Sequence, residues 1–168
     1  TMLATRLPSI LPDLSAREAV EVTSLHSVAG TLDPDGGLIR RPPLQAPHHT
    51  ASAVSLIGGG ATRLVPGSIS HGVLFLDEAP EFPARVLDAL RQPMEQGRIA
   101  VHRAVGQTAF PASFQLIMAS NPCPCGARET VDTTCGCTPV AKRRYAARLS
   151  GPLMDRVDIS VHMGVPTR

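Results

Sequence analysis

The stretch GVLFLDEAPEF, residues 72–82, decides which fold is expected of this chain. An unbroken apolar run from Val73 to Leu76 predicts a strand buried on both faces, which is typical of a parallel sheet. Two adjacent carboxylates, Asp77 and Glu78, follow this run directly. Charged groups are costly to place at the end of a buried strand, so we expect them to serve a chemical purpose there.

Helices and further strands are predicted along the rest of the chain. Ser15 with Glu18 three residues later predicts a capped helix start, and a second buried apolar run leads to Ser120 and Asn121. The predicted helices are 1–7, 14–30, 83–97 and 139–151. The other predicted strands are a β-hairpin at 98–110, a strand at 113–121 and, within 151–163, a last strand that follows a short helical turn. This alternation predicts an α/β domain with a mostly parallel sheet flanked by helices. Ligands of such sheets bind beyond the carboxyl ends of the strands.

Composition and charge limit the class of protein. The chain has 168 residues, of which 43% are hydrophobic and 18% charged, which fits one domain with a substantial core. The net charge of +2 is too small to indicate nucleic acid or membrane by itself, and 3% aromatic residues disfavour base-stacking platforms. No apolar stretch approaches the roughly 20 residues of a membrane span, and no signal peptide opens the chain. We therefore expect no membrane partner, and four cysteines confined to 123–137, which do not form a spread disulfide framework, lead us to expect a reducing cytoplasm.

The polar ends of the two buried strands suit the hydrolysis of a magnesium-bound nucleotide. Asp77 can hold Mg²⁺ through its water shell, and Glu78 can orient or deprotonate the attacking water. Asn121 can position that water against the γ-phosphate of ATP. The structural alternatives are a helix cap for Asp77 and Glu78, and an Asn-Pro turn for Asn121.

A phosphate-binding loop is missing from this sequence. The pattern G-x-x-x-x-G-K-[ST] does not occur, and GGGATR at 58–63 has no GK[ST]. The opening TMLATRLPSILP nevertheless reads as the helix that follows Gly-Lys directly. Thr1 would then supply a hydroxyl ligand for Mg²⁺, with the glycines and lysine upstream. The alternative is an unrelated helix start.

Five motifs in one order resemble the magnesium-chelatase-like AAA+ ATPases of the ComM (competence protein) type. They are APHHTAS, GGGATRLVPGSISHGVLFLDEAPEF, LDALRQPMEQGRI, NPCPCG and RLSGPLMDRVD, and the resemblance runs from Thr1 to about Val161. It implies an AAA+ P-loop NTPase core, with Asp77 and Glu78 as the Walker B pair and Asn121 as sensor 1. The Gly- and Pro-rich segment 31–70 would be an insertion before Walker B, and the predicted hairpin would precede sensor 1.

The resemblance also assigns roles to two arginines. Arg156, in LMDR, would be the arginine finger that acts on nucleotide held by a neighbouring subunit, and Arg148 is a second candidate at that interface. A guanidinium supplied by a neighbour stabilises the charge that builds on phosphoryl oxygens, which supports the role independently. The structural alternative for Arg156 is a salt bridge with Asp155 or Asp158.

The sequence departs from the family in several places. The Walker A loop, the C-terminal helical lid with sensor 2 and the N-terminal protease-like domain are absent, and Leu44 and Gln45 stand where Phe and Arg are expected. We therefore interpret residues 1–168 as a partial AAA+ core that is a poor ATPase by itself.

The four cysteines lie within 123–137 as two C-x-C pairs, which is not a spread disulfide framework. These four residues, Cys123, Cys125, Cys135 and Cys137, can close around Zn²⁺ tetrahedrally. Free thiols and adventitious disulfides are the alternatives.

Other polar residues are candidates for weaker roles. His102 and Arg103 lie near the predicted hairpin tip, and such hairpins line the central channel in ring motors of this branch, where Arg103 can meet a DNA backbone. A solvated hairpin edge is the alternative. His48 and His49 form either a structural pair or contacts to a substrate, DNA or a metal. The basic segment 142–148 indicates a subunit interface, or else a DNA-binding face.

Together these observations favour a fragment of an ATP-hydrolysing AAA+ ring motor, expected to be hexameric, with ATP and Mg²⁺ as its ligands. Its expected work is remodelling DNA in competence or recombination. The alternatives are the motor subunit of a magnesium chelatase and a regulatory module that binds nucleotide without hydrolysing it. A zinc-dependent DNA-binding module is a further alternative.

Overall fold

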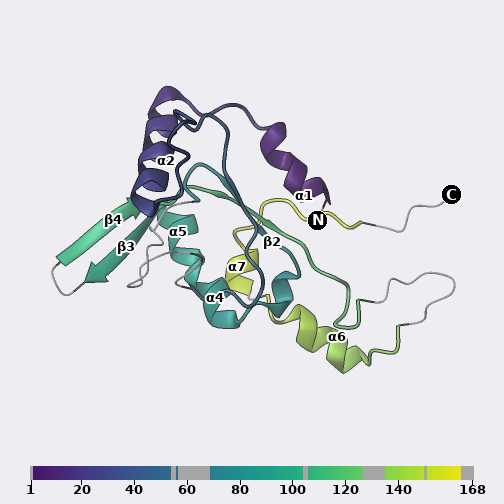
Figure 1. Cartoon of the computed structure of the whole chain (residues 1–168). Coiled ribbons are helices and arrows are strands. Elements are labelled where there is room, and N and C mark those ends of the chain that lie inside the picture. Colours follow the sequence, from purple (N-terminus) through teal and green to yellow (C-terminus); the bar gives the residue numbers. More distant parts are fainter. Residues whose placement is uncertain are drawn as a thin grey trace.

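A computed structural model gives the fold of the chain (Figure 1). It describes residues 2–53, 56, 69–103, 106–126, 135–149 and 151–163, with only the backbone described for 101–103 and 106–108. The predicted magnesium ligand Thr1 lies outside the described residues, and so do the side chains of His102 and Arg103.

The elements follow the predicted alternation of helices and strands. In chain order they are α1 (Met2–Arg6), the 3₁₀ helix η1 (Leu7–Ser9), α2 (Ala16–Ala29), β1 (Leu44–Gln45), β2 (Val73–Leu76), the 3₁₀ helix η2 (Ala79–Glu81), α4 (Ala84–Ala89), α5 (Arg91–Gln96), β3 (Arg98–Arg103), β4 (Gly106–Pro111), β5 (Gln115–Met118), α6 (Pro139–Ala146) and α7 (Gly151–Met154).

The central sheet is parallel and has the order β1-β2-β5. All four residues of β2 are buried, as expected for the middle strand. The pairing continues past β2, because the Ala119 N–H donates to the Leu76 carbonyl over 2.9 Å and the Ala79 N–H donates to the Ala119 carbonyl over 2.9 Å. The predicted α/β fold with a parallel sheet is confirmed.

Strand β1 comes from the segment that the sequence indicated as an inserted loop. Its residues Leu44 and Gln45 pair with Val73 and Leu74. Gly72 permits this approach, since a Cβ at that position would lie 2.4 Å from the Pro43 carbonyl oxygen. The segment before β2 is therefore joined to the sheet at this point.

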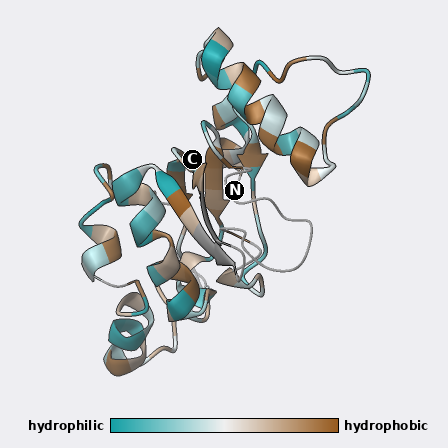
Figure 2. Cartoon of the chain, turned by 90° about the vertical axis from the view of Figure 1, so that its left-hand side faces the viewer, coloured by the Kyte–Doolittle hydropathy of each residue, from teal (hydrophilic) through white to brown (hydrophobic). Residues whose placement is uncertain are grey.

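The main core lies between the sheet and the helices that follow β2. Its buried residues come from β2, η2, α4, α7 and nearby turns, and include Leu74, Leu76, Phe82, Val86, Leu87, Leu90 and Leu153. Figure 1 shows α4, α5 and α7 close together beside the sheet, with the β3–β4 hairpin extending to one side. Figure 2 shows brown, apolar strand segments at the centre and teal residues on the outer helices.

Helix α2 has the predicted start and end. Ser15 and Glu18 form a reciprocal capping box, and Gly30 ends the helix with a left-handed φ of 70°. Hydrogen bonds from Ser15 lower the pKa of Glu18 below its ordinary value. Two carboxylates of α2 also fix His71, whose Nε2 lies 2.8 Å from Glu21 Oε1. This contact ties the helix to the turn that leads into β2.

The predicted helix 83–97 is divided into α4 and α5 at Leu90. Pro93 has no backbone N–H, so it cannot continue the hydrogen-bond ladder across this point. Gly97 ends α5 as predicted, with a φ of 62°. The predicted β-hairpin is present, with Arg98–Arg103 paired antiparallel to Gly106–Pro111.

The prediction of a last strand within 151–163 is wrong for the part of the chain that the structure describes. The short helical turn predicted at the start of this segment is present as α7, residues 151–154, but 157–163 carry no strand pairing. Apolar residues alternate with polar ones here, as in a half-buried strand, but Ile159, Val161 and Met163 are all exposed. Alternation indicates a strand only where a neighbouring backbone is available to pair.

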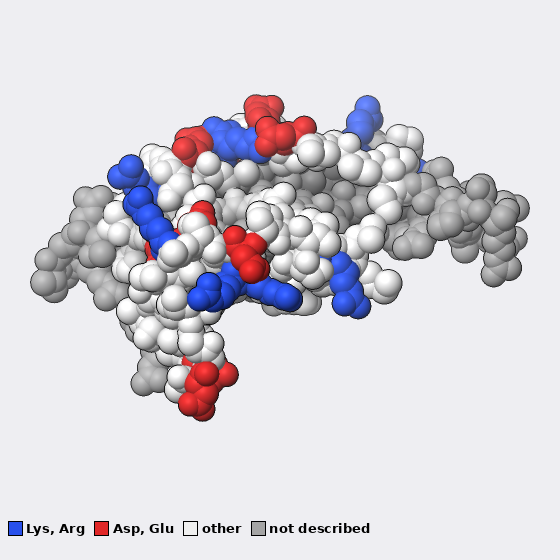
Figure 3. Space-filling model, turned by 90° about the horizontal axis from the view of Figure 1, so that it is seen from above, with Lys and Arg blue, Asp and Glu red and all other residues white. Residues whose placement is uncertain are grey.

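Charges are mixed on the face seen from above. Figure 3 shows Lys and Arg interspersed with Asp and Glu on that face, and no continuous basic area among its coloured residues. Within the described ranges, none of the helices has both the length and the apolar character needed to cross a bilayer.

Gly72→Ala should destabilise the fold, because the added methyl group overlaps the Pro43 carbonyl across the β1–β2 pair. We expect a loss of about 2 kcal/mol in unfolding free energy, measured by urea unfolding of the intact protein that carries this chain. Gly151→Ala is the matched control, since its Cβ meets nothing within 4 Å. Equal stability of the two variants would contradict the tight strand approach.

Candidate functional site

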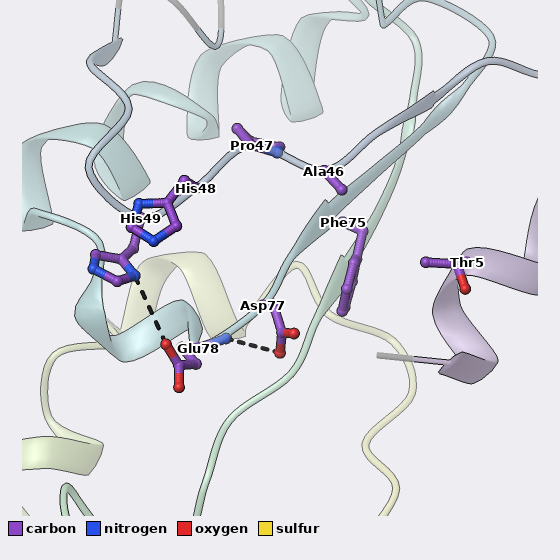
Figure 4. Close-up of a pocket in the computed structure, with 8 residues that line it drawn as sticks. All are labelled: Thr5, Ala46, Pro47, His48, His49, Phe75, Asp77 and Glu78. Atoms are coloured by element: carbon purple, nitrogen blue, oxygen red, sulfur yellow. Dashed lines mark hydrogen bonds and ion pairs between the residues drawn. The ribbon is translucent and has the colours of Figure 1, made fainter.

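A pocket of about 290 Å³ opens at the carboxyl ends of β1 and β2. Figure 4 shows Asp77 and Glu78 on one side of it and Thr5, from α1, across from them. The full lining is Thr5, Ala46, Pro47, His48, His49, Phe75, Asp77 and Glu78. The pocket thus lies where ligands bind in parallel α/β sheets.

The two carboxylates leave the strand through an unusual backbone conformation. Glu78 has φ 52° and ψ 45°, in the left-handed region, which costs a non-glycine residue roughly 1–2 kcal/mol. Its N–H donates to Asp77 Oδ1 over 3.1 Å. The strain turns the chain sharply after Asp77 and leaves the Glu78 side chain half exposed at the pocket, and strained residues of this kind gather at active sites.

Two histidines lie close to Glu78. His49 Nδ1 lies 3.7 Å from Glu78 Oε2, and the rings of His48 and His49 have centroids 4.0 Å apart. Figure 4 shows the His49 ring pointing toward the Glu78 carboxylate. The ring of His49 also meets Phe82 edge-on, with centroids 6.5 Å apart.

The contact between these histidines and the carboxylates was not predicted from the sequence. The missed signal is LQ at 44–45, followed directly by Ala46, Pro47 and the histidines. Once β1 pairs in parallel with β2, the residues that follow both strands must meet at the same edge of the sheet.

Asn121 follows β5 at the same edge and is exposed. Its neighbour in space is the buried Tyr145 of α6. Burial raises the pKa of Tyr145 above its ordinary value, the negative charges of Glu81 and Glu78 raise it further, and the Asn121 backbone and Arg148 oppose this change. Tyr145 therefore lies among the residues predicted to form the site.

Arg148 is held within its own chain. Its Nη1 lies 2.7 Å from Glu81 Oε2 and donates to the Pro80 carbonyl over 3.2 Å. The guanidinium thus fastens the end of α6 to η2, the turn directly after the two carboxylates. Its side chain remains 52% exposed.

Arg156 pairs with neither of the aspartates considered for it. Its guanidinium donates to Glu95 of α5 and to the Pro152 carbonyl. It does not line the pocket of its own chain, and its side chain is 29% exposed. The arginine is therefore oriented by a carboxylate at the surface, apart from Asp77 and Glu78.

The four cysteines come together in space. The Sγ atoms of Cys123, Cys125, Cys135 and Cys137 all lie within 4.8 Å of one another. Cys123 is buried and the other three are partly or fully accessible. Hydrogen bonding with Cys125, then with Cys135, raises the pKa of the Cys123 thiol to about 12.

These features define a class: an α/β domain with a parallel sheet, carrying a carboxylate pair and a pocket at its carboxyl edge. The family model described as magnesium chelatase, subunit ChlI, matches residues 1–167. The chain therefore belongs to this AAA+ family, which confirms the resemblance found in the sequence.

Curated relatives agree with this assignment. The chain is 52% identical over 166 residues to the protein Rv2897c of Mycobacterium tuberculosis, covering 97% of this chain and 33% of the relative. It is 45% identical over 169 residues to YifB of Salmonella typhimurium, covering 99% and 33%. It is 46% identical over 166 residues to the competence protein ComM of Haemophilus influenzae, covering 97% and 32%. The chain thus spans about a third of the length of these relatives.

Among solved structures, NtrX from Brucella abortus in complex with ADP overlaps with a TM-score of 0.46 and 14% identity, over 70% of this chain and 24% of that chain. This likeness is too distant to support any inference.

Glu81→Gln should lower the pKa of Tyr145, because the negative charge of Glu81 raises that pKa more than any other charge does. The raised pKa stabilises the fold below the unfolded value of about 10, and this contribution is lost as pH rises through the folded value. Ultraviolet titration of the phenolate, taken as a difference from Tyr145→Phe in each background, measures the shift. Glu95→Gln is the control that should leave it unchanged, and an unshifted titration in Glu81→Gln would contradict the contact.

Proposed function

We propose that the chain is part of an ATP-hydrolysing AAA+ motor that works as a ring. The observation that carries this proposal is the carboxylate pair Asp77–Glu78 at a pocket on the carboxyl edge of the sheet, in a chain of the ChlI family. In this proposal residues 1–168 supply part of the core, and the phosphate loop and lid lie elsewhere in a longer protein. Relatives about three times as long support that division.

The donor set fits a magnesium-bound nucleotide. Mg²⁺ prefers oxygen ligands and keeps much of its water, and the pocket offers the Asp77 carboxylate for such a contact. Thr5 borders the pocket from α1, and Thr1, the proposed hydroxyl ligand of Mg²⁺, lies four residues earlier in the sequence. When bound, Mg²⁺ neutralises charge on the phosphates.

The other side chains around the pocket have separate roles in the proposed hydrolysis. Glu78 orients the attacking water and accepts its proton, while His49, 3.7 Å away, fixes the position of that carboxylate. Asn121, at the end of the neighbouring strand, holds the same water. Arg148 keeps the turn after Glu78 in place through its ion pair with Glu81.

Arg156 acts on the nucleotide of a neighbouring subunit in this proposal. Its absence from the pocket of its own chain and its partial exposure support a role across an interface. Glu95 orients the guanidinium, which can then stabilise charge on the phosphoryl oxygens. Six subunits would place such an arginine at every nucleotide.

Remodelling of DNA in competence or recombination is the proposed work of the ring, and the cytoplasm its proposed location. The printed name of the Haemophilus relative, a competence protein, supports this choice. The β3–β4 hairpin, with His102 and Arg103, is the element proposed to contact DNA. The family description favours a second candidate, the motor subunit of a magnesium chelatase.

Glu78→Gln should reduce ATP turnover by about 100-fold or more, because the amide cannot accept a proton from water. Binding of a fluorescent ATP analogue should persist, since the pocket is otherwise intact. The intact protein is assayed for phosphate release beside Asp35→Asn, an exposed carboxylate away from the pocket. Turnover in Glu78→Gln at the rate of that control would refute the assigned role.

The same assay separates the two candidate functions. Turnover stimulated by DNA in the wild type, and lost in Glu78→Gln, supports the DNA motor. Turnover that ignores DNA favours the chelatase motor. Bound nucleotide without any turnover favours a regulatory module.

Arg156→Ala should reduce hydrolysis by roughly 10³-fold or more while nucleotide still binds. Mixing Arg156→Ala subunits with Glu78→Gln subunits should restore part of the turnover, because interfaces then form that have both an intact Glu78 and an intact Arg156. Phosphate release by the mixture measures this recovery, and Arg17→Ala serves as the arginine control. Full activity of Arg156→Ala would disprove the finger, and an inactive mixture of assembled subunits would disprove its action across the interface.

A further inference from the structure

The four cysteine sulfurs have the spacing of a tetrahedral thiolate site. Cys123 Sγ lies 3.2 Å from Cys125 Sγ and 3.3 Å from Cys135 Sγ, and Cys125 Sγ lies 3.6 Å from Cys135 Sγ. Zinc–sulfur bonds of about 2.3 Å in a tetrahedron put the sulfurs about 3.8 Å apart. The observed separations are close to that edge length, with Cys137 inside the same group.

The same separations argue against disulfides. No disulfide joins any of these four described cysteines, and a disulfide would bring two sulfurs to about 2.05 Å. Each of these three separations is much longer than a bond, and all four sulfurs, with that of Cys137 included, lie within 4.8 Å of one another. A single centre shared by four thiols accounts for this arrangement, whereas two separate bonds do not.

A tight turn makes the first pair suitable as ligands. The Gly126 N–H donates to the Cys123 carbonyl over 3.1 Å, and Gly126 has a left-handed φ of 64°, which glycine adopts without steric cost. The turn encloses Pro124 and brings the thiols of Cys123 and Cys125 together. Cys135 and Cys137 close the group from a part of the chain ten residues further on.

We propose that these four cysteines bind one Zn²⁺ ion in a closed structural site. Four thiolates in a tetrahedron select zinc or an iron–sulfur cluster, and one small ion fits sulfurs already in contact, whereas a cluster core requires wider spacing. A site with four protein ligands leaves no open position for chemistry. The role of the metal is therefore structural: it would hold the first pair of cysteines, Cys123 and Cys125, next to the second pair, Cys135 and Cys137.

The metal connects two parts of the candidate active site. Cys123 lies two residues after Asn121, and Cys137 directly precedes Thr138, whose hydroxyl accepts from the Ala141 N–H and caps α6. The same helix carries Tyr145 and leads to Arg148. The ion would fix the end of β5 relative to the start of α6, and so fix Asn121 against the helix that fastens η2. This consequence rests on the proposed function, whereas the metal site itself does not.

Metal content is the first test, made on the intact protein purified without an affinity tag that binds metal. Elemental analysis should find about one zinc per chain in this site. Cys125→Ser should lose most of that zinc, and Pro124→Ala, which changes the same turn and keeps every thiol, should retain it. Absence of zinc, iron with inorganic sulfide in its place, or zinc undiminished in Cys125→Ser would each overturn the proposal.

A measurement on the wild type covers the case in which Cys125→Ser does not fold. A mercurial reagent is titrated against the thiols while a coloured chelator reports released zinc. Zinc should appear in proportion to the four thiols modified, and its loss should lower the midpoint of thermal unfolding, because a structural metal contributes to folding free energy. Thiols that react without releasing zinc would overturn the site.

Turnover separates the metal site from the proposed function. With the metal and the ATPase both present, depletion of zinc should reduce phosphate release and leave binding of the ATP analogue nearly unchanged. Zinc bound to a protein without turnover would contradict the ATPase and leave the metal site standing. Undiminished turnover after complete removal of zinc would overturn the connection to Asn121.

Discussion

Parallel pairing of β1 and β5 with β2 is the constraint on which the site depends. Hydrogen bonds on both sides of β2, from Val73 to the Pro43 carbonyl and from Gln115 to the Gly72 carbonyl, set the register. Strands that run in one direction end at one edge, so three distant segments deliver their polar residues to the same place. The pocket at Asp77 and Glu78 follows from that geometry, because its other walls are continuations of β1 and a neighbouring helix.

Around this edge, ion pairs fix the turns that lie outside the hydrogen-bonded strands of the sheet. Arg148 holds η2 in place, and the pKa of the buried Tyr145 responds to nearby charges of both signs. On the opposite side, Glu21 fixes His71 at the turn into β2. Partly exposed pairs of this kind add little stability individually, so their main effect here is to restrict the positions that the turns can take.

Local patterns in the sequence predicted the strands and helix ends that depend on interactions within a few residues. The unbroken apolar run before Asp77 indicated β2, and the Ser15–Glu18 spacing indicated the start of α2, since burial and capping act within a few residues. The position of the two carboxylates at the end of a buried strand was also readable, because it needs only the residues that follow that strand. Pairing between distant segments was not readable in this way. The two-residue β1 was therefore missed, and with it the contact between His49 and Glu78.

Ion-pair partners were equally hidden from sequence reasoning. The sequence suggested the neighbouring aspartates as partners of Arg156. Its guanidinium instead pairs with Glu95 of α5, because the packing of α7 places the two side chains together. The alternation of apolar residues after Arg156 indicated a strand that had no described partner. In both cases the deciding factor is which surfaces meet, and a single sequence does not contain that information in any local form.

The left-handed backbone at Glu78 has a consequence for how such a domain can change. A glycine would relieve the strain at this position at no steric cost, so selection for a more robust fold alone would favour losing the carboxylate. Where the glutamate persists in a lineage, something other than folding must be retaining it. At this one residue, selection for stability and selection for function thus favour different amino acids, whereas elsewhere in the protein both act on the same contacts.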